Sequence, residues 1–106
     1  MAWIYLTVAG IFEVIWAFAM KQSDGFTRPA ATTVTIGAMI VSFALLSLSM
    51  KSLPLGTAYT IWTGIGAVGA FLVGIFVLGE QANAMRIVAA LLIVSGLVLM
   101  KLSSPA

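Results

Sequence analysis

Hydrophobic and polar positions occur in long separate blocks along this chain. Continuous apolar runs cover residues 3–20, 30–50, 56–78 and 85–100, and short polar connections separate them. A membrane-spanning helix needs about 20 predominantly apolar residues, whereas a barrel strand gives about ten residues of alternating hydrophobicity. The pattern therefore predicts an all-α integral membrane protein with four transmembrane helices.

Helix-breaking residues mark the connections between these runs. Gly25 and Pro29 lie in the first connection, Pro54 closes the second, and the third is a polar turn at residues 79–83. Glycine and proline commonly mark turns because of their special backbone preferences. We expect residues 1–106 to form a single four-helix transmembrane domain.

The first run has an alternative interpretation as a signal peptide. The sequence Ala17-Phe18-Ala19 resembles a small-residue cleavage site. However, no Lys or Arg precedes the apolar stretch, and more apolar runs follow it, which is not typical of a signal peptide. We expect the first run to be a transmembrane helix.

The composition narrows the classes of function. Of 106 residues, 62% are hydrophobic and 8% charged, whereas soluble domains have about 45–50% apolar and about 25% charged residues. The chain has no Cys and no His, so we expect no disulfide, no haem or zinc site and no cofactor. Ser, Thr and one buried Glu supply no catalytic triad, so an enzyme is not expected. The net charge of +2 gives no reason to expect nucleic acid as a partner.

The basic residues are almost evenly divided between the two membrane faces. With four spans, Lys51 and Lys101 lie on one side, and Lys21, Arg28 and Arg86 lie on the other. An excess of Lys and Arg on one side normally sets the orientation of a membrane protein. Because the bias is so small, we hypothesise insertion in both orientations and an antiparallel homodimer. One fixed orientation, set by a weak bias, is the alternative.

Glu13 lies in the middle of the first apolar run. A carboxylate at that depth costs about 2.5–3.5 kcal/mol on insertion scales, and such residues usually mark proton or ion sites. A structural ion pair is the alternative, but every Lys and Arg lies at the end of a span. Glu13 is therefore expected to be protonated, or paired with a cation that comes and goes.

Helical spacing places small and aromatic residues beside Glu13. Gly10 and Ala17 share its helix face, and they leave room for a ligand or a neighbouring backbone. Trp16 offers a ring face to a cation and an indole N–H to an acceptor. An interfacial anchor is the common role of a membrane tryptophan, but Trp16 lies deep in the run, which favours a role at the site.

Three residues on other spans are further candidates for the site. Tyr59 and Trp62 are three positions apart in the third run, and they offer a hydroxyl and a second aromatic wall. Ser42 lies in the middle of the second run, where its hydroxyl either orients Glu13 or bonds back to its own helix. Taken alone, the second role is the commoner one for such a serine.

Glycines crowd the third run at Gly64, Gly66 and Gly69. Spacing of small residues by four positions lets membrane helices approach closely, and we expect these glycines to serve packing or a bend. They also match a dinucleotide-binding fingerprint by letters alone. No strand precedes them, so we reject that interpretation.

The chain resembles the small multidrug resistance family, and within it the guanidinium exporter branch. The segments that carry the resemblance are Gly10-Ile-Phe-Glu-Val-Ile-Trp16, Ser23-Asp-Gly-Phe-Thr-Arg28 and Gly56-Thr-Ala-Tyr-Thr-Ile-Trp-Thr-Gly64. The resemblance covers essentially the whole chain. Trp16, one turn after the acid, looks like the guanidinium branch, because the multidrug branch typically has a small residue there.

The resemblance implies a proton-coupled antiporter in a bacterial inner membrane, which exports guanidinium cations as an antiparallel homodimer by alternating access. It implies that proton and substrate compete for Glu13, with Trp16, Ser42, Tyr59 and Trp62 in support. A promiscuous exporter of quaternary ammonium cations is the alternative within the family. A small structural subunit of a membrane complex is the alternative from another class.

Overall fold

The computed structural model describes residues 1–103, and this part of the chain contains four α-helices. They are α1 (Ala2–Gln22), α2 (Pro29–Ser49), α3 (Leu55–Phe76) and α4 (Ala84–Ser103). All four are long and apolar enough to cross a membrane. The prediction of an all-α fold with four spanning helices is confirmed. The third helix ends at Phe76, where the apolar run had predicted residue 78.

Backbone-restricting residues explain where α2 and α3 begin. Pro29 is the first residue of α2, where a missing N–H costs nothing because that group has no helical acceptor. Pro54 is the N-cap of α3 and has an extended backbone. Between α1 and α2, Asp24, Gly25 and Phe26 all have positive φ angles, which reverse the chain in a tight loop. The first and second helices are therefore antiparallel neighbours.

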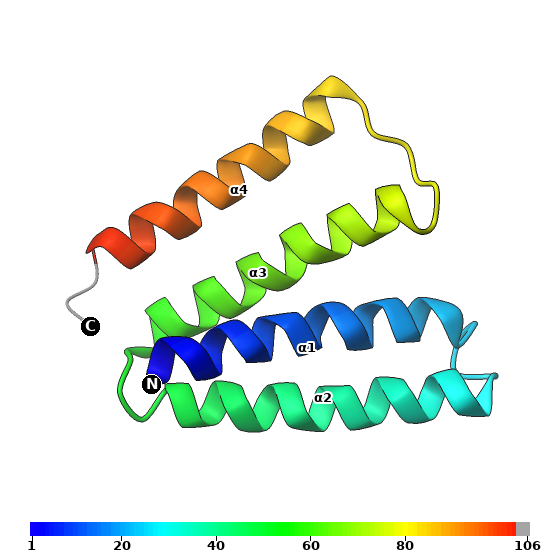
Figure 1. Ribbon diagram of the computed structural model, residues 1–106, viewed down its shortest axis with the longest axis horizontal. Coiled ribbons are helices and arrows are strands. Elements are labelled where there is room, and N and C mark those ends of the chain that lie inside the picture. Colours follow the sequence, from blue (N-terminus) through cyan, green and yellow to red (C-terminus); the bar gives the residue numbers. More distant parts are fainter. Residues whose placement is uncertain (104–106) are drawn as a thin grey trace.

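Helix α1 lies between α2 and α3 (Figure 1), and it packs against both of them. Because the two connections place α2 antiparallel to α1, the third helix runs in the same direction as the first. The C-terminal ends of α1 and α3 therefore lie at the same end of the molecule. A side chain of α1 that faces α3 therefore contacts an α3 residue at a similar distance from the helix ends.

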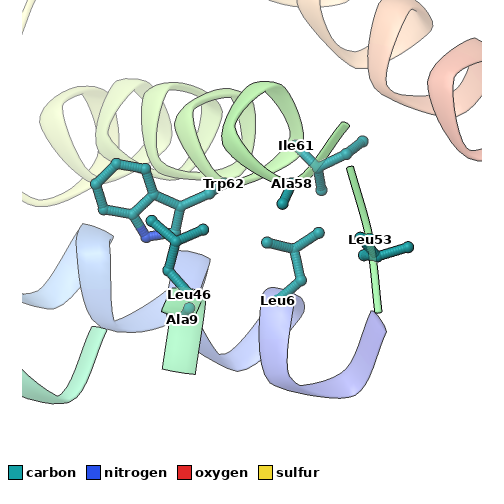
Figure 2. Packing of buried hydrophobic residues seen from close by; sticks show 7 residues of the cluster. All are labelled: Leu6, Ala9, Leu46, Leu53, Ala58, Ile61 and Trp62. Carbon is teal, nitrogen blue, oxygen red and sulfur yellow. The ribbon is translucent and has the colours of Figure 1, made fainter. Parts of the chain in front are cut away.

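The buried core is at the N-terminal end of α1 and α3 (Figure 2). Leu6 and Ala58 are fully buried there, and they bring these two helices together. The ring of Trp62 closes the cluster toward the middle of the molecule. The cluster consists of Leu6, Ala9, Leu46, Leu53, Ala58, Ile61 and Trp62.

Helix α4 lies beside α3, on the side away from α1 and α2 (Figure 1). Its backbone packs against α3, and none of its described residues is buried. Near its C-terminal end, Lys101 Nζ lies 4.3 Å from the ring centre of Trp3 on α1. At its N-terminal end, Arg86 lies over the ring of Phe71 on α3. Leu97 and Met100 pack against the core, while most of the other large apolar side chains of α4 are exposed.

Candidate functional site

Glu13 faces α3, and its carboxyl group lies directly against Gly66. A Cβ atom added to Gly66 would overlap Oε1 and Cδ of Glu13. The Glu13 side chain is half-buried, and within residues 1–103 its buried Oε1 has no hydrogen-bond partner. An unpaired buried polar atom is costly in free energy. A ligand that donates a hydrogen bond to this oxygen would remove that cost.

Trp16 lies one helical turn after Glu13 and carries a second unpaired polar atom. Its indole Nε1 is buried and has no acceptor within residues 1–103. The ring contacts Phe43 of α2 edge to face, with 6.5 Å between centres. The turn of α1 around Glu13 thus offers an acceptor, a donor and an aromatic surface close together.

Ser42 of α2 connects three of the helices, namely α1, α2 and α3. Its side chain is fully buried, and its hydroxyl donates to the carbonyl oxygen of Ala9 on α1 over 2.7 Å. The indole Nε1 of Trp62 on α3 donates to the Ser42 hydroxyl oxygen over 2.9 Å. Neither of the two bonding partners expected from the sequence is used here, because the hydroxyl bonds to the backbone of a different helix. Ala9 lies one turn before Glu13, so Ser42 fixes the turn that supports the acid.

A row of aromatic rings crosses the three helices beside this network. Phe43 lies between Trp16 and Trp62, and its ring centre is 5.6 Å from that of Trp62. Tyr59 continues the row, 5.8 Å from Trp62, and its side chain is exposed. Phe43 is not among the site residues that the sequence predicted. Its position directly after Ser42 on the same helix is the only signal in the sequence that could have suggested it.

The candidate glycines lie at helix contacts. A Cβ at Gly10 would meet Ile65 of α3, so Gly10 accommodates a neighbouring helix. Gly69 receives Val14 of α1 in the same way, while Gly64 receives Leu97 of α4. Together with Gly66, these residues let α1 and α4 approach the two sides of α3. Only Gly66 touches the acid itself.

The residue types at this site are ones that suit a bound cation. It has one carboxyl group, aromatic faces that attract positive charge and a buried hydroxyl network. Among residues 1–103, no group of three or more His, Cys, Asp or Glu side chains is placed to hold a metal ion. The geometry therefore favours a cation that bonds to a single carboxylate and stacks on rings.

Comparison with known proteins agrees with this chemistry. The family model described as "Small Multidrug Resistance protein" matches residues 1–93. The chain belongs to the small multidrug resistance family. A "Guanidinium exporter" of Escherichia coli (strain K12) is 55% identical over 104 residues, which cover 98% of this chain and 99% of that protein. Proteins of the same name from Citrobacter freundii and Salmonella typhimurium are each 53% identical over the same coverage.

Membership of this family indicates where in the cell the site lies. The four apolar helices and the bacterial relatives together indicate a multi-pass protein of the bacterial inner membrane, with a role in transport. Glu13 consequently lies at membrane depth, near the midpoint of α1, and the aromatic row lies beside it on α1, α2 and α3.

Proposed function

We propose that this protein exports guanidinium cations in exchange for protons, and that both bind at Glu13. The observation that carries the proposal is the buried and unpaired carboxyl oxygen of Glu13 beside Trp16 and Gly66. The relatives named as guanidinium exporters support the choice of substrate, because they match nearly the whole chain at 53–55% identity.

The chemistry of guanidinium suits these residues. The ion is planar, weakly hydrated and rich in N–H donors, so it pairs with a carboxylate through two parallel hydrogen bonds. The half-buried Trp16 supplies a ring face on which a flat cation can lie, and Phe43 connects it to the buried ring of Trp62. Sodium and potassium ions need several oxygen ligands, and a single carboxylate does not provide them. The site thereby selects for shape as well as charge.

Exchange follows when proton and cation compete for one group. A protonated Glu13 does not bind the cation strongly, and a bound guanidinium keeps the carboxyl group ionised. The two ligands therefore displace each other, and each lowers the apparent affinity for the other by the same factor. If the empty, charged site changes its exposure slowly, transport of one ion is coupled to transport of the other.

The working unit in this proposal is an antiparallel homodimer. Two observations support it: the outward apolar surface of α4, and the nearly equal numbers of Lys and Arg expected on the two faces. A pair of oppositely oriented copies resembles the inverted repeats of larger transporters, which expose a central site to each side in turn. The two Glu13 side chains would then face one shared path.

Export of quaternary ammonium cations is the alternative that the exposed Tyr59 side chain and outward apolar surfaces favour. The two substrate classes are separated by uptake into proteoliposomes that contain the purified protein. We expect uptake of guanidinium and none of a bulky aromatic quaternary ammonium ion. Uptake of the bulky cation with no guanidinium uptake would replace the proposed function by the alternative.

A further inference from the structure

A second carboxyl group lies against α3, at the end where both α1 and α3 finish. Gly79 has a φ angle of +70°, which turns the chain back so that the Glu80 amide donates to the Gly74 carbonyl over 2.8 Å. A Cβ atom at Gly74 would overlap the Glu80 carboxyl group. The carboxyl of Glu80 is thus held on the helix surface and does not extend freely from the loop.

This carboxyl group borders a cavity of about 200 Å³ between α1 and α3. Lys21 and Glu80 are the charged residues of its wall, while Ala17, Ala70 and Gly74 are small residues that keep it open. A volume of this size is several times the roughly 30 Å³ that one water molecule occupies in the liquid. A small hydrated or partly hydrated cation fits into it beside the two charged groups.

The cavity lies between the same two helices as the site, nearer their C-terminal ends. Glu13, Ala17 and Lys21 follow at steps of four on α1, and Gly66 and Gly74 lie on the facing side of α3. Val14, the residue after Glu13, is part of the cavity wall. Gly66 and Gly74 are eight residues apart, which is about 12 Å along a helix. A carboxyl group lies against each of these glycines: that of Glu13 against Gly66 at membrane depth, and that of Glu80 against Gly74 at the end of the helices.

We propose that Glu80 is an outer binding station for the same guanidinium-type cation, and that Lys21 is its internal competitor. The inference rests on the proposed function, since it needs a cation that travels to Glu13. In this proposal, Lys21, which lines the same cavity, partly neutralises Glu80 when no substrate is bound. An arriving cation takes its place and is held about two helical turns from Glu13. The exposed position of Glu80 keeps binding weak and exchange rapid.

The test compares guanidinium uptake by proteoliposomes containing the wild type, Glu80→Gln and Lys21→Met, at low ionic strength. The station concentrates the substrate near its path, so we expect Glu80→Gln to raise KM about two- to fivefold, the range for a partly exposed charge pair. The maximal rate should stay within about twofold of wild type, because Glu13 still performs the exchange. Lys21→Met should lower KM, and the double variant should resemble Glu80→Gln because Lys21 acts through Glu80.

Asp24→Asn is the matched control. Asp24 is an exposed acid that follows α1 at the same end of the molecule, and it is not part of the cavity wall. A similar rise of KM in Glu80→Gln and Asp24→Asn would show that the effect comes from general surface charge, and it would contradict a binding station at Glu80. An unchanged KM in Glu80→Gln would do the same. Absence of guanidinium uptake by the wild type is a different result, because it contradicts the proposed function itself.

Discussion

Trp62 donates its indole N–H to the hydroxyl of Ser42 over 2.9 Å, and these residues belong to different helices. The same hydroxyl donates to the Ala9 carbonyl, which in a regular α-helix is the acceptor for the amide of Glu13. One buried chain of hydrogen bonds therefore connects α3 and α2 to the turn of α1 that carries the acid. Substitutions at Ser42 or Trp62 should consequently change the position of the α1 turn that carries Glu13.

Ser42→Ala should destabilise the protein and weaken guanidinium binding. The substitution leaves the buried Trp62 N–H without an acceptor, which costs about 1–3 kcal/mol. Trp62→Phe removes the donor as well, so the double variant should cost clearly less than the sum of the two single variants. The free energies of unfolding from denaturing-detergent titrations form the double-mutant cycle. Additive values would show that the bond does not couple these helices.

Gly66→Ala should reduce guanidinium affinity about tenfold, or about 1.4 kcal/mol. The added Cβ would occupy the place of the Glu13 carboxyl group, which is the flexible end of a side chain and can move away without unfolding the helices. Gly37→Ala on α2 is the matched control, because a Cβ there meets nothing within 4 Å. The measurement is the equilibrium binding of guanidinium in detergent. Equal guanidinium affinities in the two variants would show that Gly66 is not part of the binding site.

Trp16 should control the size of the accepted cation. Trp16→Gly removes the ring that contacts Phe43, so relative uptake of bulkier cations over guanidinium should rise. Trp16→Phe keeps a ring but removes the unpaired indole N–H, and it should retain most of the size selectivity. The uptake ratio for the two cations in proteoliposomes is the readout. An unchanged ratio in Trp16→Gly would count against the assignment to guanidinium.

The nearly balanced charges predict that the chain inserts in both orientations. A reporter fused to the C-terminus should be active on both sides of the membrane in wild-type cells. Lys51→Gln leaves Lys101 alone against the three basic residues of the opposite face, so it should move the reporter mostly to the outside. Lys51 is exposed, so the substitution removes charge without disturbing the core. A wild-type reporter detected on one side only would contradict the antiparallel dimer.

The four helices could be predicted because continuous apolar runs and the prolines between them determine both length and position. Glu13 stood out in the sequence because no cation within its span can neutralise it, and the structure agrees that its Oε1 has no partner among residues 1–103; its role in transport stays a prediction. Gly66 was selected as a packing glycine, and its contact with Glu13 was not foreseen. That contact depends on the register between α1 and α3, which cannot be predicted from the hydrophobic pattern of either helix alone.

The polar network could not be derived from the sequence for the same reason. Ser42 and Trp62 are 20 positions apart, and only the register between α2 and α3 brings them to bonding distance. Phe43 is an apolar residue with an exposed side chain, and only the packing of the three helices shows that its ring joins Trp16 to Trp62. The position of Glu80 depends on the left-handed turn at Gly79, which a polar connection alone does not specify.

The central claim is that one carboxyl group exchanges a proton for a guanidinium ion. The most direct measurement follows both ions together, using proteoliposomes with an acidic interior and guanidinium outside. Wild-type protein should take up guanidinium while protons leave, and Glu13→Gln should abolish both fluxes although the protein remains folded and inserted. Guanidinium uptake by Glu13→Gln at the wild-type rate, or wild-type uptake without proton efflux, would contradict the account.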